Sequence, residues 1–276
     1  MKNKSNWKKN AIFFIGGQFI SMFGSMLVSY AITWSVTLKE QSGSLIALFT
    51  CATMLPMVLS SPIAGVLADR YNRKHLINIS DGIIALITLI VAILYISGFK
   101  SIWLLFIAAI ARSFGQGIQQ PAVNSLIPQI VPEEHLARFN GIQSTTQSLT
   151  MFAAPMVAGA LLTFLPIEMI FFIDVFTAII GISTVFFFVK VTHIANTEYK
   201  SGIKAYFHEF KEGINFISKQ KWLKTILIFT GIFCILASPA SMLTPLQVTR
   251  TFGDDVWRLT AIEILFSVGM MLGGIL

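Results

Sequence analysis

The sequence predicts an all-α membrane protein, a bundle of long apolar helices, on the strength of two observations. Hydrophobic residues make up 55% of the 276 residues and charged residues only 12%, with a mean hydropathy of +0.74, which is outside the range of soluble domains. The apolar residues also form continuous runs instead of the short alternating strands of a membrane β-barrel. Because lipid offers the backbone no hydrogen-bond partner, such runs are expected to be helices.

Eight apolar runs follow one another along the chain. A hydrocarbon core of about 30 Å needs roughly 20 apolar residues in a helix, which predicts seven full crossings and an eighth run that reaches the last residue. The runs are about 11–38, 44–68, 76–97, 102–127, 139–164, 167–189, 223–249 and 259–276. The first run is too long, and is followed by too many others, to be a cleaved signal peptide.

The runs divide the chain into three parts. Residues 1–189 form a six-helix transmembrane block, residues 190–221 a polar connecting segment, and residues 222–276 the start of a second block. In the connecting segment, apolar residues recur at helical spacing. They are Ile203, Tyr206, Phe207, Phe210, Ile214 and Ile217. This pattern predicts an amphipathic helix, either lying on the cytoplasmic membrane face or packed on the ends of the bundle.

Lysine and arginine are distributed unevenly between the two ends of the predicted helices. With the N-terminus in the cytoplasm, most of the 20 basic residues fall in cytoplasmic segments, as is typical of multi-pass membrane proteins. Only Lys39, Lys100, Arg250 and Arg258 then lie outside, and Arg112 lies within a helix. The net charge of +7 is therefore explained by topology and anionic lipid head groups, and it does not indicate nucleic-acid binding.

The turn between the second and third runs is a compact charged motif, Gly-Val-Leu-Ala-Asp-Arg-Tyr-Asn-Arg-Lys. Its glycine is expected to let a neighbouring helix approach the backbone closely, and its basic residues hold the turn in the cytoplasm. The spacing Gly-x-x-x-Asp-Arg-x-x-Arg-Lys resembles the signature loop of the major facilitator superfamily, a family of alternating-access secondary transporters. The matching residues, expected to form a gating loop, are Gly65, Asp69, Arg70, Arg73 and Lys74.

The resemblance implies a major-facilitator-type helical bundle of two six-helix halves, with substrate bound between them near the midplane. In the family, the carboxylate that matches Asp69 faces the positive N-terminal end of a helix in the second half and helps to close the cytoplasmic side. Here residues 1–189 correspond to a complete N-terminal half, and residues 222–276 only to helices seven and eight. The chain is therefore expected to be a piece of a longer protein, the product of a disrupted reading frame, or a half that requires a complementary chain.

Two charges lie deep inside predicted helices, where each costs roughly 2.5–3.5 kcal/mol. Arg112 lies about ten residues into the fourth run and Asp174 about seven into the sixth, hence ~15 and ~10 Å below the same membrane boundary. These depths allow a buried ion pair. Such a pair either only holds the helices together or responds to protonation in the cavity. The second interpretation follows because burial raises the pKa of a carboxyl group and a nearby guanidinium lowers it.

Two further carboxylates are candidates for proton coupling. Asp81 is only about six residues inside the third run, close enough to the helix end to reach the interface. Glu263 lies near the outer end of the eighth run and has no predicted partner nearer than Arg258 or Arg250. Each is an ionisable group in a membrane helix and therefore a functional candidate.

The fifth run combines Pro155 with Gly159 among several alanines. Proline removes a backbone donor, and small residues let helices cross closely in lipid. The pattern resembles the helix-five motif of exporters that exchange drugs for protons, although Ala154 and Ala160 replace two of its glycines; a generic packing helix is the alternative. Stretches 119–122 and 172–174 resemble the drug-exporter branch that includes bacterial macrolide-efflux proteins.

Four residues of the first run are candidates for the wall of a substrate cavity: Gln18, Ser25, Tyr30 and Trp34. They span more than one helical face, so not all of them can line it. Cys51 and Cys234 lie within apolar runs and are expected to be structural. No cofactor, metal site or enzymatic motif is predicted, because the sequence has no phosphate-binding glycine loop and its histidines lack metal-ligand spacing.

These observations predict a transporter and not an enzyme. We expect a bacterial, multi-pass protein of the plasma membrane that exports hydrophobic or amphipathic small molecules in exchange for protons. Its partners are then the lipid bilayer, protons and the transported compound. Two alternatives remain, a nutrient symporter of the same fold and a non-transporting membrane protein that is truncated or binds a partner chain.

Overall fold

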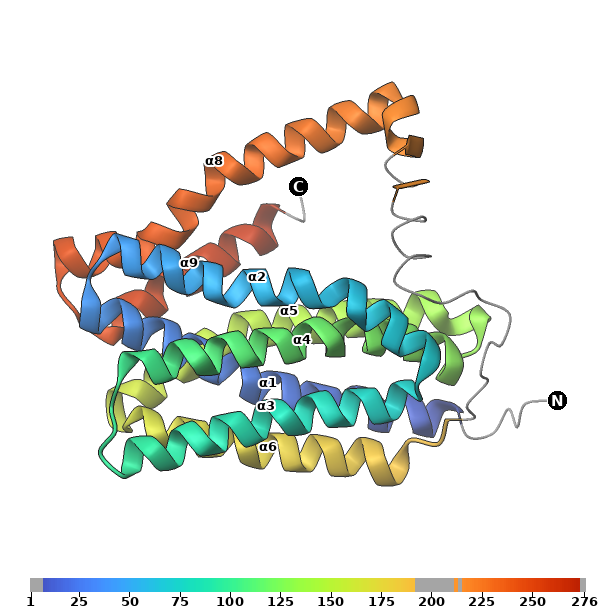
Figure 1. The fold of residues 1–276 in the computed structure, drawn as a ribbon, viewed down its shortest axis with the longest axis horizontal. Coiled ribbons are helices and arrows are strands. Elements are labelled where there is room, and N and C mark those ends of the chain that lie inside the picture. Colours follow the sequence, from blue (N-terminus) through green and yellow to red (C-terminus); the bar gives the residue numbers. More distant parts are fainter. Residues whose placement is uncertain (1–6, 192–210, 213–214, 274–276) are drawn as a thin grey trace.

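The structure, a computed structural model, describes residues 7–191, 211–212 and 215–273; at residues 62, 66, 69–70, 241–242 and 270–273 it describes the backbone alone. Over these residues the chain forms long helices joined by short turns, and no strand is present among them. Figure 1 shows most of them running side by side along one axis. The helices are α1 (Trp7–Glu40), α2 (Gly43–Arg70), α3 (Arg73–Ile96), α4 (Ile102–Ile130), α5 (Glu133–Phe164), α6 (Ile167–Phe188), α8 (Lys221–Phe252) and α9 (Val256–Gly273).

Seven helices in the described part of the chain are long and apolar enough to cross a membrane, which confirms the seven crossings expected from hydropathy. Several helices extend beyond the apolar runs that predicted them. α5, for example, begins at Glu133 instead of residue 139, because hydropathy marks the part of a helix that lipid surrounds while backbone hydrogen bonding continues into polar residues.

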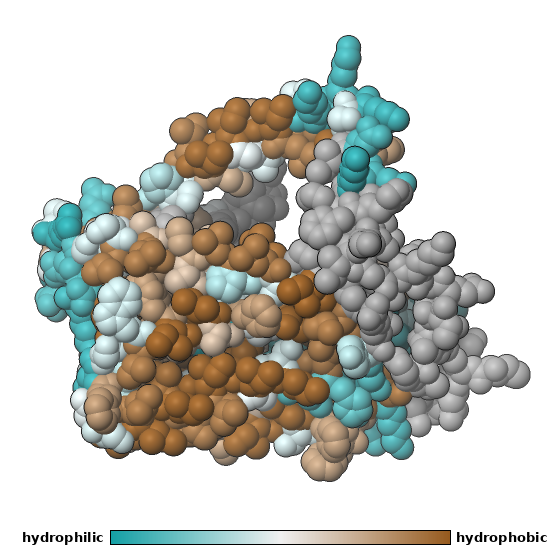
Figure 2. All heavy atoms as spheres, viewed as in Figure 1, coloured by the Kyte–Doolittle hydropathy of each residue, from teal (hydrophilic) through white to brown (hydrophobic). Residues whose placement is uncertain are grey.

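The first six helices form a bundle in which neighbours in space are not always neighbours in sequence. α1 packs against α6 and α5, α2 against α4, and α3 against both α4 and α6. One buried cluster includes Trp34, Tyr95 and Phe171, and a second, toward the other end of the bundle, includes Phe14 and Ile77. On the face that Figure 2 shows, the surface is apolar over the middle of the bundle, and hydrophilic residues lie toward the helix ends, as expected for a bundle surrounded by lipid.

The close approach between α2 and α4 occurs at a different glycine from the one expected in the charged motif. A Cβ atom at Gly65 would meet no described atom within 4 Å, so the described residues show no close approach at this glycine. At Gly117 on α4, a Cβ atom would lie 2.6 Å from the backbone oxygen of Met57 on α2. The crossing of α2 and α4 is therefore centred on Gly117, because the missing side chain there lets the two backbones meet.

α8 diverges from the bundle (Figure 1), and its apolar span is not buried. It contacts the bundle near its C-terminal end, where Arg250 Nη2 donates to the carbonyl oxygen of Gln41 at 2.5 Å. α9 then returns and packs against α5. Cys51 on α2 and Cys234 on α8 are both free and exposed on the helix surface. Their expected structural role stays a prediction.

The amphipathic helix expected around residues 203–217 falls mostly outside the described residues. Lys211, Glu212 and residues 215–219 are helical. Ile203, Tyr206, Phe207, Phe210 and Ile214 lie outside the described part, so the amphipathic character stays a prediction.

Candidate functional site

An ion pair lies in the interior of the six-helix bundle. Arg112 Nη1 on α4 is 2.5 Å from Asp174 Oδ2 on α6, and the two residues are only 3% and 1% exposed. Sequence reasoning placed these residues at similar depths, and the structure brings them together. An Asp–Arg pair in such a setting is compensated, whereas either residue alone would be a buried unpaired charge.

Two hydroxyl side chains complete this charged cluster: Ser25, which was expected to line a cavity, and Thr88, which sequence reasoning did not indicate. Thr88 on α3 donates to Asp174 Oδ2 at 3.2 Å and also accepts from Arg112 Nη1. Ser25 on α1 donates to Asp174 Oδ1 at 3.2 Å, and its carbonyl oxygen accepts from Arg112 Nη2 at 2.9 Å. The cluster therefore joins α1, α3, α4 and α6, and the carboxylate accepts hydrogen bonds at both oxygens.

Asp81 on α3 is buried, with 4% of its surface exposed. The expectation that it reaches the interface is wrong, because α3 begins at Arg73 and carries Asp81 about two turns into the bundle. Its Oδ1 accepts a hydrogen bond of 2.7 Å from Gln119 Nε2 on α4. Within the described part of the chain no basic side chain forms an ion pair with it, so this carboxylate differs from Asp174 in having a neutral partner.

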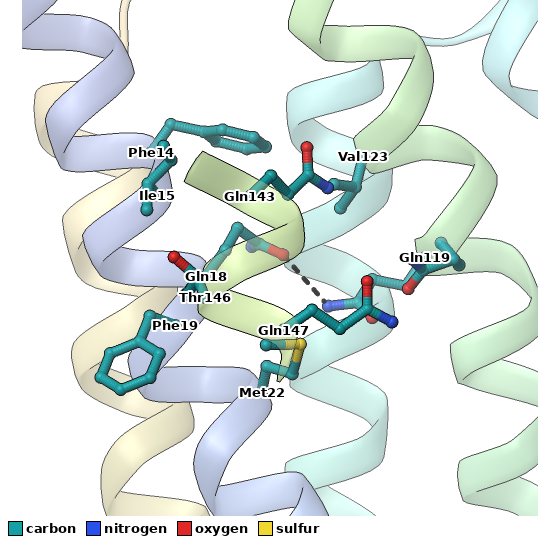
Figure 3. A pocket seen from close by; sticks show the side chains of 11 residues that line it. Phe14, Ile15, Gln18, Phe19, Met22, Gln119, Val123, Gln143, Thr146 and Gln147 are labelled. Atoms are coloured by element: carbon teal, nitrogen blue, oxygen red, sulfur yellow. Dashed lines mark hydrogen bonds between the residues drawn. The ribbon is translucent and has the colours of Figure 1, made fainter. Parts of the chain in front are cut away.

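A pocket opens next to Asp81, between α1, α4 and α5 (Figure 3). Gln18 lines it, as expected, and the Oε1 atom of Gln18 lies 3.5 Å from Gln119 Nε2. The wall combines amides with apolar side chains and includes no charged residue. The lining residues are Phe14, Ile15, Gln18, Phe19, Met22, Gln119, Gln120, Val123, Gln143, Thr146 and Gln147.

The other three cavity candidates on α1 are not among the lining residues, and Ser25 belongs to the charged cluster described above. Trp34 is 1% exposed and belongs to the core, so the expectation that it lines a cavity is wrong in this conformation. Tyr30 is half-buried, and its ring lies 5.7 Å from that of Trp34. Hydropathy could not distinguish these positions, because it does not tell which face of α1 meets its neighbours.

Helix α5 packs closely at the motif that sequence analysis identified. Pro155 is buried within the continuous helix, and a Cβ atom at Gly159 would lie 3.2 Å from Trp34 Cζ3 and would also contact Thr260 on α9. The glycine therefore lets α5 approach α1 and α9 together.

Glu263 on α9 is half-buried and lies within electrostatic range of the Tyr30 phenol. Neither basic residue considered as its partner contacts it. Arg258 forms an ion pair with Asp255 at 2.9 Å, and Arg250 donates to the carbonyl oxygen of Gln41 in the turn before α2. Glu263 therefore stays a candidate without an assigned role.

The turn between α2 and α3 ties helix ends together through its basic side chains. Arg73 donates from Nε to the carbonyl oxygen of Ala68 at 3.1 Å and from Nη1 to that of Ser125 on α4 at 2.6 Å. Lys74 Nζ donates to the carbonyl oxygens of Phe186 and Val189, each at 2.7 Å, at the C-terminal end of α6. Carbonyl groups at helix C-termini lack intrahelical donors, so these cations stabilise the ends.

The remaining residues of the loop motif, Asp69 and Arg70, close α2, and only their backbone is described. Asn72 caps α3 by accepting a hydrogen bond from the backbone N–H of Lys74 at 3.0 Å.

In the described residues no group of three side chains is arranged to hold a metal ion.

Comparison with known proteins agrees with this architecture. The family model described as Major Facilitator Superfamily matches residues 14–276. The chain is 28% identical over 276 residues to macrolide efflux protein A of Streptococcus pyogenes, covering 100% of this chain and 68% of that protein. It is 29% identical over 222 residues to macrolide efflux protein A of Enterococcus faecalis, covering 80% and 68%. A multidrug efflux pump of Staphylococcus aureus is 22% identical over 265 residues, covering 92% and 57%.

Proposed function

The chain belongs to the major facilitator superfamily, and on this basis we propose that it exports hydrophobic or amphipathic compounds, macrolides among them, by alternating access in exchange for protons. It is a multi-pass membrane transporter and not an enzyme. Similarity to efflux proteins over the whole chain favours export over uptake.

The observation that supports proton coupling is the buried carboxylate of Asp81. A carboxylate inside a membrane bundle is costly unless it is paired or protonated. Asp81 is buried, and the donor that hydrogen-bonds it at 2.7 Å is the uncharged amide of Gln119. Taking up a proton removes its charge in this conformation, and opening of the bundle to water restores it. Alternation between the two environments then links proton movement to conformational change.

The other charged groups in the bundle interior differ from Asp81 in that they compensate each other. The helices packed against α3 present Arg112 on α4 and Asp174 on α6, which form the ion pair, while α1 presents uncharged Gln18 and Ser21. We assign Asp81 the proton-binding role, and the Arg112–Asp174 pair the role of holding α4 and α6 in register. Glu263 is a secondary candidate for the same chemistry.

The loop at residues 65–74 is proposed to gate the cytoplasmic side. Arg73 and Lys74 tie the ends of α2, α4 and α6 into one unit, so that this end of the half moves as a rigid body. Asp69 supplies the carboxylate that contacts the second half when the cytoplasmic side closes. This assignment places the N-terminus in the cytoplasm of a bacterial cell, in agreement with the distribution of lysine and arginine.

The proposal is tested by expressing residues 1–276 in bacteria and measuring export of ethidium before and after a protonophore collapses the proton gradient. We expect export that stops when the gradient collapses, relative to cells that carry the empty vector. Accumulation of a labelled sugar or peptide would instead identify a symporter. Absence of any gradient-dependent movement would contradict the proposal and favour the alternative of a non-transporting membrane protein.

A further inference from the structure

The pocket between α1, α4 and α5 lies near the middle of the helices that form it. Gln18 is eleven residues from the start of α1 at Trp7, which corresponds to ~16 Å of helical rise. Gln147 lies close to the midpoint of α5, and Gln119 is in the central part of α4. The pocket is therefore at the depth where a compound crossing the bundle would be held.

One side of this pocket is polar and the other is apolar. Gln18, Gln119, Gln143 and Gln147 extend toward one another from three helices, as Figure 3 shows, and Thr146 adds a hydroxyl. The apolar lining includes Phe14, Phe19 and Met22. Five glutamines line the pocket, and an amide that is buried there, such as that of Gln18, is costly unless something pairs with it.

Two of these amides have a hydrogen-bonding group left over. Gln18 Nε2 is buried and has no hydrogen-bond partner in the described part of the chain. Gln119 uses its Nε2 to bind Asp81 at 2.7 Å, so its Oε1 remains as an acceptor. Gln18 thus offers a donor and Gln119 an acceptor, and a hydroxyl group matches both in kind, because it donates one hydrogen bond and accepts another.

We propose that this pocket is a subsite for an uncharged, hydroxyl-bearing part of the exported compound, such as an attached sugar. This inference rests on the proposed export function and adds the chemical class that the site recognises. The amides of Gln18, Gln119, Gln143 and Gln147 bind the hydroxyls, and the phenylalanines and Met22 contact the apolar body of the same compound. Asp81 holds Gln119 in the orientation that presents its carbonyl oxygen to the pocket.

Other ligand classes fit the lining less well. A cationic group would find no carboxylate among the lining residues, and an anionic group would find no lysine or arginine there. A purely apolar group would leave Gln18 Nε2 unpaired. A neutral group rich in hydroxyls is therefore the chemistry that matches the pocket.

The test measures equilibrium binding of two probes to the full chain purified in nanodiscs. Erythromycin is a glycosylated macrolide with many hydroxyls, and tetraphenylphosphonium is an apolar cation with no hydrogen-bonding group. The variants are Gln143→Leu and Gln147→Leu; both side chains reach solvent, so either protein is expected to fold. Gln129→Leu, on α4 but outside the pocket lining, is the matched control.

Each pocket variant is expected to weaken erythromycin binding about fivefold, the effect of one lost hydrogen bond. Binding of tetraphenylphosphonium, and of both probes to the control, should stay unchanged. Unaltered erythromycin binding, or equal weakening of both probes, would overturn the subsite. If the wild-type chain binds tetraphenylphosphonium but not erythromycin, the subsite is overturned while the export function stands. If it binds neither probe, the proposed function fails, and the subsite with it.

Discussion

Arg112 on α4 and Asp174 on α6 meet at 2.5 Å in the interior of the bundle, and Ser25 on α1 and Thr88 on α3 complete the contact. Four of the six helices are thereby joined at one point by polar interactions. In lipid the hydrophobic effect does not drive helices together, because the lipid tails are as apolar as the side chains. Polar contacts such as this one therefore contribute specificity to helix packing.

Replacing Asp174 by Asn should destabilise the bundle, because it leaves the guanidinium of Arg112 buried without a counter-charge. Loss of one partner from a buried pair costs about 3–5 kcal/mol, so the yield of monodisperse protein and its Tm in detergent should both fall. The double variant Asp174→Asn with Arg112→Gln removes both charges and should recover part of the loss. A double variant no more stable than the single one would show that the two charges are not coupled.

Replacing Asp81 by Asn should preserve the fold and abolish proton coupling. The Asn side-chain oxygen can still accept from Gln119, but the group no longer binds and releases a proton. In proteoliposomes with an imposed pH gradient, uphill transport of the compound should fall more than tenfold. Exchange of labelled for unlabelled compound, with equal concentrations on both sides of the membrane, should continue. Asp255→Asn is the control, since that carboxylate lies in an exposed pair with Arg258. Uphill transport at the wild-type rate by the Asp81 variant would exclude this residue as the coupling site.

Alanine at Gly117 on α4 and at Gly65 on α2 should have opposite effects on stability. At Gly117 the new methyl group would overlap the backbone of Met57, which cannot rotate away, and such overpacking costs about 1–3 kcal/mol. At Gly65 it would meet no described atom, and alanine favours a helix by about 0.5–1 kcal/mol over glycine. Thermal unfolding of the two purified variants gives the comparison; equal Tm values would contradict the crossing described above.

Replacing Lys74 by Met should loosen the C-terminal end of α6. The variant keeps the apolar stem but loses the hydrogen bonds to Phe186 and Val189 and the favourable charge at the helix end, together about 1–2 kcal/mol. Limited proteolysis after residue 188 should become faster. Lys190→Met changes an exposed lysine at the same end and should leave the cleavage rate unchanged. Equal rates in both variants would show that Lys74 does not stabilise this end.

Much of the fold could be predicted from the sequence because lipid restricts the choices. A continuous apolar run in a bilayer has to be a helix, so composition and run length were sufficient for the seven crossings and their order. The family followed from the motif between the second and third runs. The depths of Arg112 and Asp174 could also be counted along their helices, since the rise per residue is constant.

The candidate site was only partly predictable. The sequence indicated Asp81 and Gln18 but placed Asp81 near the interface, and it assigned Trp34 to a cavity and close packing to Gly65. Thr88 and the glutamines of α4 and α5 were not recognised as site residues, because single polar residues in an apolar run carry no signal of what they face.

The sequence by itself determined that this chain is a membrane-spanning helical transporter of one family, since the solvent dictates helices and the charged turn identifies the family. Only the tertiary structure decided that Arg112 meets Asp174, that Asp81 binds Gln119, and that Gly117 lies at the helix crossing. The physical reason is that hydropathy reports position along a helix axis, whereas these contacts depend on the rotation of each helix about that axis and on which helices are neighbours.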